Sequence, residues 1–329
     1  MTTCHCCKGP VKKNGRFQNR NRIVQRFICK TCHQTFSEEQ PLDGVRIEAD
    51  KAAQVVRLLV EGVGILATSR LTGLNPRTVL NVLAAAGEHC ARLLDSTIRN
   101  VEVESVQCDE TFCFVGCKER NNTAKDYDRG AQYLFLSIDS RSKIILNHVI
   151  GKRDSGNAND LINDLNERVA GRFQLTTDSY APYQNCVRYR LGERVDFAQL
   201  MKLYSGNKLD LNAHHQYSPP VCTGIRKYIR SGNPDRKLIS TSYVERTNLS
   251  IRLFNRRFTR LTLGFSKKIE FLKHSVALFI AHFNFCRKHS AHSQTPAQAA
   301  RLTNHQWSVE ELLAITTPEK KGNSTRTTI

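Results

Sequence analysis

Long apolar runs are missing from this 329-residue sequence. No stretch approaches the roughly 18 residues that a membrane-spanning helix needs, which argues against a membrane protein. The first residues, MTTCHCCKGPVKK, also lack the apolar segment of a secretory signal. We therefore expect a soluble cytoplasmic protein, in which the 12 cysteines bind metal or are buried rather than forming disulfides.

Acidic residues are scarce relative to basic ones. The chain has 30 Asp and Glu against 49 Lys and Arg, which gives a formal net charge of +19. A field of this sign favours a nucleic acid over an anionic membrane, because no basic amphipathic anchor is present. The alternative, that the charge only aids solubility, fits less well because the basic residues cluster. We expect double-stranded DNA as the partner and the nucleoid as the location.

Cysteines concentrate in residues 1–40, where two C-x-x-C pairs flank a basic stretch of about twenty residues. Four thiolates at this spacing can bind one Zn²⁺ tetrahedrally, which predicts a zinc ribbon. The ligands that fit the spacing best are Cys4, Cys7, Cys29 and Cys32. The residues that could replace one of them are His5, Cys6 and His33. A reduced cluster without metal is the alternative, although this segment has few large apolar residues to fold around.

Residues 50–97 follow an acidic linker and show the apolar periodicity of three helices. The third helix has a good N-cap in Asn75 and a proline, Pro76, at its first position. Arg77 and Thr78 then lie in the first turn, where a helix-turn-helix motif contacts bases or phosphates. This pattern predicts a DNA-binding domain, with a purely structural three-helix bundle as the alternative.

The periodicity changes at residue 101. The pattern predicts, in order, strands at 101–116, 131–139 and 143–151, a helix at 157–170, a strand ending at 178, a helix at 183–192 and a short strand near 194–197. This order is that of a ribonuclease-H-like α/β domain over residues 101–290, a mixed sheet with helices on both faces.

The rest of this domain is less regular. Residues 198–241 have few long apolar runs and are interpreted as an insertion with basic contacts. Helices are expected at 242–258 and 265–289. A C-terminal segment, 291–329, ends in a polar tail that we expect to be disordered.

Three acids stand at chemically useful places in this predicted fold. Asp109 lies inside the first strand, Asp178 ends the strand expected beside it, and Glu245 lies on a following helix. Three carboxylates with open positions can hold two Mg²⁺ or Mn²⁺ ions for in-line phosphodiester displacement. Arg252 lies two helical turns after Glu245 and so on the same face, where it could bind phosphate. The arginines that would extend this basic track are Arg246, Arg256, Arg257 and Arg260.

Each acid also has a plainer interpretation. Asp178 could cap a helix or begin a turn, and Glu245 could simply favour the helix dipole. Glu110 is an alternative to Asp109, but the period of a strand directs it to the opposite face. We interpret Asp139 as a turn residue and Glu270 as a charge on a helix surface.

The segments QCDETFCFVG, TTDSYAPY and SYVERTNLSIRLFNRRFTRLTLGFSKK together resemble DDE-type transposases of bacterial insertion sequences. The group is the one typified by the first-numbered insertion sequence, and the resemblance covers nearly the whole chain. It implies that Asp109, Asp178 and Glu245 are the metal-binding catalytic triad, followed by the basic residue Arg252. The chain is longer than typical members between Asp178 and Glu245.

The resemblance implies cleavage at the terminal inverted repeats of an element and attack of the freed 3′-hydroxyl on target DNA. It also implies at least a homodimer, because two ends are joined. Two other functions remain open on the sequence alone. One is a ribonuclease-H-like nuclease without strand transfer, and the other is a DNA-binding regulator descended from a transposase that has lost catalysis.

Overall fold

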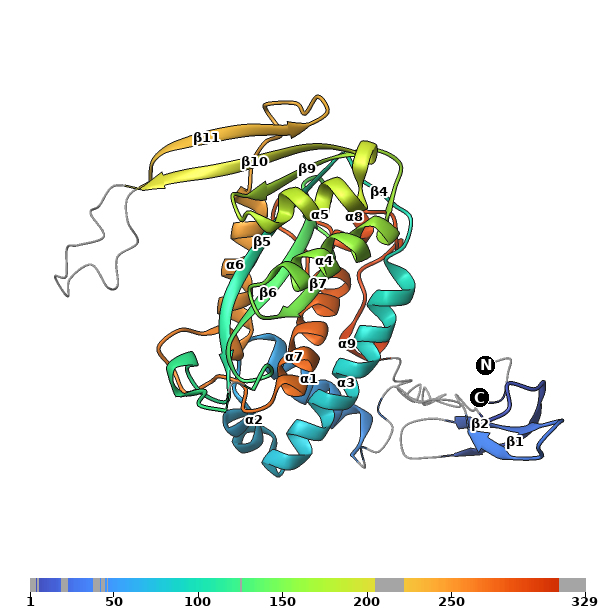
Figure 1. The fold of residues 1–329 in the computed structure, drawn as a ribbon. Helices are drawn as coiled ribbons and strands as arrows, with labels where there is room; N and C mark the ends of the chain where they lie inside the picture. Colours follow the sequence, from blue (N-terminus) through green and yellow to red (C-terminus); the bar gives the residue numbers. More distant parts are fainter. Residues whose placement is uncertain are drawn as a thin grey trace, which may run out of the picture.

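A computed structural model gives the fold (Figure 1). The residues that it describes are 4, 6–18, 23–37, 42, 45, 47–124, 126–204 and 222–313. The first of them form a small antiparallel sheet in the order β1-β2-β3, with β1 at Val11–Gln18, β2 at Ile23–Cys29 and β3 at Thr35–Ser37. Most of β1 is exposed, so this sheet has little apolar core of its own.

Three helices follow, α1 at Ala49–Val60, α2 at Ile65–Thr72 and α3 at Pro76–Thr97. Gly73 ends α2 in the left-handed conformation, with φ of 71°, which glycine adopts without a steric penalty. The side chain of Asn75 accepts a hydrogen bond from Arg77 N and so caps α3. The expected N-cap of the third helix is therefore confirmed, whereas contact of this segment with DNA stays a prediction.

Helix α3 packs against α7, Ile269–Ala281, and the two helices approach closely at Gly87. A Cβ atom at Gly87 would lie 2.5 Å from the Cα of His274, so only glycine fits without movement. Buried residues of α1 and α3 belong to the same hydrophobic core as those of the large sheet. The core therefore crosses the domain boundary that the sequence places between residues 97 and 101.

The large sheet has six strands in the order β11-β10-β9-β5-β6-β7. Its strands are β5 Ser105–Val115, β6 Gly130–Asp139, β7 Ile145–Gly151, β9 Phe173–Asp178, β10 Val195–Tyr204 and β11 Cys222–Ser231. Strands β5, β9 and β10 are parallel, and the other neighbours are antiparallel. This mixed sheet with flanking helices is compatible with the predicted ribonuclease-H-like fold.

Helices α4, Ser155–Arg168, and α5, Pro182–Arg190, pack together on one face of the sheet, and α6, Ser242–Phe254, packs on β5 from the other. The remaining elements are short: β4 Val101–Glu102, β8 Val169–Ala170, α8 Pro296–Ala299, α9 Val309–Leu312, a π-helix at His282–Cys286, and 3-10 turns at Glu119–Asn121, Gly192–Arg194 and Arg256–Phe258. No helix in the described part of the chain has the length and apolarity needed to cross a bilayer.

Several predicted boundaries differ from the structure. The helix expected at 265–289 is α7, Ile269–Ala281, followed by the π-helix at His282–Cys286, and the strand expected at 101–116 is divided into β4 and β5. The helix expected at 242–258 ends at Phe254, because Asn255 leaves the helical conformation and exchanges hydrogen bonds with Ser275 on α7. The insertion expected at 198–241 overlaps the sheet, because β10 continues to Tyr204 and β11 adds an edge strand. The sequence hides β11 because most of its residues are exposed, so it has no apolar face. The tail expected at 316–329 lies outside the described residues.

Candidate functional site

Asp109, Asp178 and Glu245 line one open cleft with a volume of about 480 Å³. The cations that line the same cleft are Arg153 and Lys202. The three acids come from β5, β9 and α6, which are far apart in the sequence. The fold therefore brings the predicted trio to one surface.

The register of the parallel strands β5 and β9 places the two aspartates together. Their last paired residues are Cys108 and Thr177, and the next residue along each strand is an aspartate, Asp109 or Asp178. Strand β9 ends at Asp178, so both carboxylates lie where the sheet opens to solvent. This is the edge at which a mixed sheet commonly places its functional groups.

Helix α6 is fixed on β5 by two side-chain contacts. Gln107 Oε1 accepts hydrogen bonds from the backbone N–H of Tyr243, at 2.9 Å, and of Val244, at 3.2 Å. These are unsatisfied donors at the start of the helix, so Gln107 acts as its cap. One helical turn further on, Asn248 Nδ2 donates to Asp109 Oδ2 at 2.9 Å. The residue between these contacts, Glu245, is thereby held at the cleft.

Hydrogen bonds and an ion pair orient the Glu245 carboxylate. Thr241 Oγ1 donates to Glu245 Oε1 at 2.6 Å, and Lys202 on β10 forms a salt bridge with Glu245 Oε2. The side chain of Glu245 is 37% exposed, so it faces the open cleft rather than the core. The plainer interpretation of Glu245, a first-turn acid facing solvent, does not account for these partners.

Burial and mutual repulsion perturb the acids of this cleft. Burial, followed by the negative charge of Asp178, raises the pKa of Asp109 from 3.8 to about 7. Burial also raises the pKa of Asp178, against the opposing effect of the Tyr180 backbone N–H, which donates to it at 3.0 Å. Clustered carboxylates that resist ionisation in this way suit a divalent cation, which favours their charged forms.

Glu110 belongs to the same cluster, although sequence reasoning set it aside. Carboxylate oxygens of Asp109, Glu110 and Asp178 lie within 4.8 Å of one another. Glu110 does point to the opposite face, as expected, because its partners come from the α5 side: Arg153 donates at 3.2 Å, and Tyr183 lies beside it. It still reaches Asp178 because β9 ends there. The sequence signal that could have identified Glu110 is the pair of adjacent acids, Asp109 and Glu110, inside one strand.

The Glu110 carboxyl is almost completely enclosed, with a side chain only 3% exposed. Burial, followed by the charge of Asp178, raises its pKa to about 7. The Tyr183 hydroxyl is close enough to lower this pKa as a donor, but the contact misses the geometry of a formed hydrogen bond, so Glu110 Oε1 has no partner among the described residues.

Arg153 was also missed by sequence reasoning. It follows β7, lies 3.2 Å from Glu110 Oε2 and 3.6 Å from Asp178 Oδ2, and stacks over the ring of Tyr180 at 4.2 Å. Arg252, which was predicted, does not line the cleft. Its Nε is buried without a partner among the described residues, and burial lowers its pKa while Asp109 raises it. Arg252 is therefore close enough to be affected by the charge of Asp109, but it does not line the cleft.

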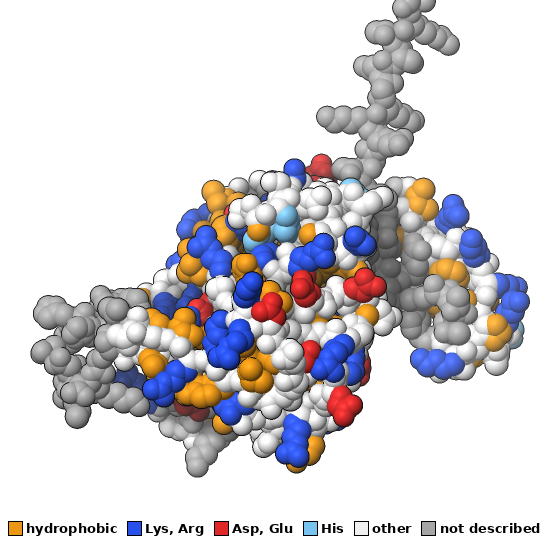
Figure 2. Space-filling model, turned by 90° about the horizontal axis from the view of Figure 1, so that it is seen from above, with side chains coloured by type: hydrophobic (Ala, Val, Ile, Leu, Met, Phe, Trp, Pro, Cys, Tyr) orange, Lys and Arg blue, Asp and Glu red, His pale blue; other side chains and the backbone are white. Residues whose placement is uncertain are grey.

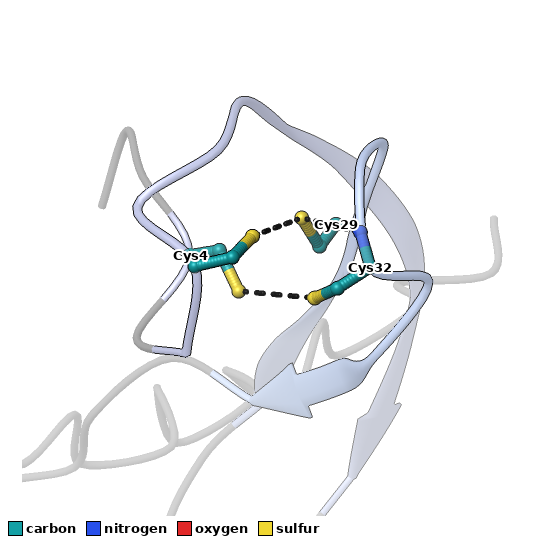
Figure 3. A group of neighbouring side chains, drawn as sticks. Cys4, Cys29 and Cys32 are labelled. Atoms are coloured by element: carbon teal, nitrogen blue, oxygen red, sulfur yellow. Dashed lines mark hydrogen bonds between the residues drawn. The ribbon is translucent and has the colours of Figure 1, made fainter.

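The four predicted cysteine ligands do converge. Cys4 Sγ lies 3.7 Å from Cys32 Sγ, and Cys7 Sγ lies 3.4 Å from Cys29 Sγ (Figure 3). All four sulfur atoms are within 4.8 Å of one another. Tetrahedral Zn–S bonds of about 2.3 Å would place the sulfurs about 3.8 Å apart, so this cluster fits zinc.

Backbone contacts around the cluster also suit a metal ligand. The N–H groups of Cys32 and Thr31 lie 3.4 and 3.3 Å from Cys29 Sγ. They lower the pKa of this thiol to about 6, which favours the thiolate that binds metal. Of the possible substitutes, Cys6 and His33 are exposed, and His5 lies outside the described residues.

The predicted DNA-binding residues differ in exposure. Arg77, Arg246 and Arg256 are exposed, so their guanidinium groups are free to meet phosphate. Thr78 and Arg257 are half-buried. Burial lowers the pKa of Arg257 to about 10, which makes it a poorer candidate for a surface contact than its neighbour Arg256.

The two other acids agree with their plain interpretations. Asp139 accepts hydrogen bonds from the backbone N–H and hydroxyl of Ser142, at 2.7 and 2.5 Å, in the turn after β6. Glu270 is exposed in the first turn of α7. Neither residue lines the cleft.

Comparison with known proteins gives fold neighbours but no family. No protein-family model matches the chain, and no curated protein matches it. A chain of the simian T-cell lymphotropic virus intasome in complex with PP2A regulatory subunit B56 gamma is 16% identical over 76% of this chain and 74% of that one, with a TM-score of 0.34. The piggyBac transposase in a synaptic complex with hairpin DNA is 11% identical over 81% of this chain and 72% of that one, with a TM-score of 0.36. At these TM-scores the likeness does not decide the function.

Proposed function

We propose that this protein is a DDE-type transposase that uses Mg²⁺ or Mn²⁺ to cut and join DNA. The observation that carries the proposal is the meeting of Asp109, Asp178 and Glu245 in one cleft. A DNA-binding regulator has no need of three converging carboxylates in a protein of net charge +19, where they repel phosphate. Their placement is easier to understand if a cation separates them from the DNA.

The residues that would hold the metal are the three cleft acids. Bound there, two divalent ions would activate the attacking oxygen and stabilise the leaving oxygen of an in-line phosphodiester displacement. Asn248 keeps Asp109 in place, and Thr241 keeps Glu245 in place. These contacts fix the ligands before metal binding, so the site needs little reorganisation.

The cations of the cleft have a separate role in this proposal. Arg153 and Lys202 each pair with a cleft acid and also line the opening. Both side chains would be placed to pair with the non-bridging oxygens of a phosphate bound in the cleft. Arg252 adds a positive field near Asp109. In the cutting step, water would attack the phosphorus at the element end, and the 3′-oxygen of the element would leave as a 3′-hydroxyl. In the joining step, that 3′-hydroxyl would attack a phosphorus of the target DNA in the same cleft, and a 3′-oxygen of the target would leave.

Binding of the element's terminal inverted repeats and of target DNA would fall to other parts of the chain. The first turn of α3 offers Arg77 and Thr78 to one groove, and Arg246 and Arg256 extend the basic surface beyond the cleft. The cysteine cluster would hold Zn²⁺ and stabilise the small sheet β1–β3, which has little apolar core. A homodimer or larger assembly would hold two DNA ends together.

The test is cleavage and joining of DNA that carries the ends of the element. We expect Mg²⁺-dependent cutting by the wild type and at least a 100-fold loss of rate in Asp109→Asn, Asp178→Asn and Glu245→Gln, because each change removes a metal ligand. Glu270→Gln is the matched control, since it removes an exposed acid outside the cleft.

Three outcomes separate the candidates. Cleavage that survives all three cleft changes would reject the site. DNA binding without any cleavage by the wild type would favour the regulator. Cleavage with no joining of pre-cut 3′ ends would favour a nuclease that only hydrolyses DNA.

A further inference from the structure

Strands β10 and β11 extend beyond the rest of the sheet as a two-stranded ribbon. Strand β9 pairs with β10 only as far as the Asp178–Leu200 pair. From Met201 to Tyr204, the pairing that the structure describes for β10 is with β11 alone. Figure 1 shows this extension reaching past the helices. The ribbon tip, residues 201–204 with 222–226, therefore begins directly beyond a cleft acid.

The ribbon tip and the rest of β11 carry basic side chains and no acidic ones. The basic residues are Lys202, Arg226, Lys227 and Arg230. Arg226 and Lys227 are consecutive in a strand, so they point to opposite faces. Both are exposed, as are Tyr204 and Ile225. Figure 2 shows the molecule from above the view of Figure 1, and on this face Lys and Arg side chains lie among hydrophobic ones.

The ribbon is continuous with the cleft. Leu200, Lys202 and Tyr204 alternate along β10 and line the cleft opposite Glu245. The ribbon tip extends about 13 Å beyond Leu200, at about 3.3 Å per residue. A major groove about 12 Å wide admits a two-stranded β-ribbon, and its depth of about 8.5 Å is less than the length of this extension.

We infer that the β10–β11 ribbon inserts into the major groove of the DNA duplex beside the phosphate held in the cleft. The inference rests on the proposed function, which supplies the duplex. Basic side chains on both faces of the ribbon meet the phosphates on both sides of the groove. The apolar groups of Tyr204 and Ile225 face the base edges, where thymine methyl groups offer apolar contact. The ribbon would thus set the distance between the groove contacts and the cleavage position.

A second copy of the chain is the main alternative occupant, because the outer edge of β11 lies at the end of the sheet order. Exposed edges can pair with one another. Pairing two β11 edges would bring Arg226, Lys227 and Arg230 of one copy against the same residues of the other. Like charges facing each other across strands are unfavourable, so the charge pattern favours DNA.

The test compares Arg226→Gln/Lys227→Gln with the matched control Arg92→Gln/Lys288→Gln, which removes the same charge at exposed positions away from the ribbon. The readouts are affinity for a short labelled DNA duplex as a function of salt, and protection of guanine N7 from methylation in the major groove. We expect the ribbon variant to bind about 10-fold more weakly, with a salt slope smaller by about 1.8 for two lost phosphate contacts. It should also lose N7 protection, and the control should keep it.

Three results would overturn the inference. Equal losses of affinity in ribbon variant and control would mean that net charge alone matters. Unchanged N7 protection in the ribbon variant would place the ribbon outside the groove. A change in oligomeric state by light scattering, with DNA affinity kept, would assign the ribbon to contact between copies. If the wild type cleaves DNA in any of these cases, the proposed function stands and the ribbon inference alone fails.

Discussion

Replacing Asp109 by Asn should stabilise the protein at alkaline pH in the absence of magnesium, while removing its activity. The pKa of Asp109 in the fold is about 7, against an ordinary value of 3.8. A raised pKa means that the folded state binds more protons than the unfolded chain between these values. The stability that protonated Asp109 gives the folded state is therefore lost as pH rises from about 4 to about 7. Asparagine has no proton to lose, so the variant avoids this loss.

The magnitude follows from about 1.4 kcal/mol per pKa unit. The raised pKa of Asp109 costs the fold about 4 kcal/mol at pH 8, where both states are ionised, and about 1.5 kcal/mol at pH 5, where only the unfolded chain has lost its proton. The advantage of Asp109→Asn should therefore grow by about 2 to 3 kcal/mol between these pH values. Asn248 contributes little to the difference, because an amide oxygen at position 109 can still accept its hydrogen bond.

Urea unfolding of both proteins at pH 5 and pH 8 measures this difference. Magnesium is left out, but no chelator is added, because a chelator would also strip zinc from the cysteine cluster. Added Mg²⁺ at pH 8 should then stabilise the wild type more than the variant. If the stability advantage of Asp109→Asn is the same at both pH values, the pKa of Asp109 is not raised in the fold and the prediction is wrong.

Three further changes test other parts of the fold. Cys29→Ser should lose zinc, measured by atomic absorption, and make the segment around β1–β3 more sensitive to protease, because the sheet has little other core. Gly87→Ala should lower the free energy of unfolding in urea by about 1–3 kcal/mol, since a Cβ there meets His274 Cβ at 2.4 Å. A gain of stability, the usual result of Gly→Ala in a helix, would contradict this packing. Gln107→Ala should lower the free energy of unfolding by about 1–3 kcal/mol, because it leaves two N–H groups of α6 unsatisfied, and it should also reduce the stabilisation of the protein by Mg²⁺. Unchanged stabilisation by Mg²⁺ would mean that the Gln107 contact with α6 does not support the metal site.

The catalytic candidates could be predicted from the sequence because strand patterns carry positional information. An aspartate inside an apolar strand is rare enough to mark Asp109, and a strand that stops at an aspartate marks Asp178. Two such strands become neighbours in the expected topology, and their register then places both acids at one sheet edge. The order of the elements made the two aspartates candidates, and the register seen in the structure brings them together.

Partners from distant loops could not be predicted in the same way. Arg153 reaches Asp178 from the loop after β7, and Lys202 reaches Glu245 from a strand that the sequence assigned to an insertion. Neither contact has a local signal, because a basic residue in a loop or on an edge strand is ordinarily solvated. The shared core of α3 and α7 is hidden for a similar reason, since the close approach at Gly87 depends on a residue of another helix.

The placement of Glu245 shows why an acid occurs in a helix otherwise rich in arginine. Gln107 and Asp109 lie two residues apart on one face of β5, and they bind the first turn and the second turn of α6 respectively. Glu245 lies between these two attachments, so its position relative to Asp109 is set by the strand rather than by the loop that precedes the helix. Outer arginines such as Arg246 and Arg256 can move without disturbing it, because they are exposed and contribute charge rather than position. The helix thus separates two tasks by face: the side toward β5 fixes a carboxylate, and the side toward solvent carries Arg246, to which the proposed function assigns a contact with DNA.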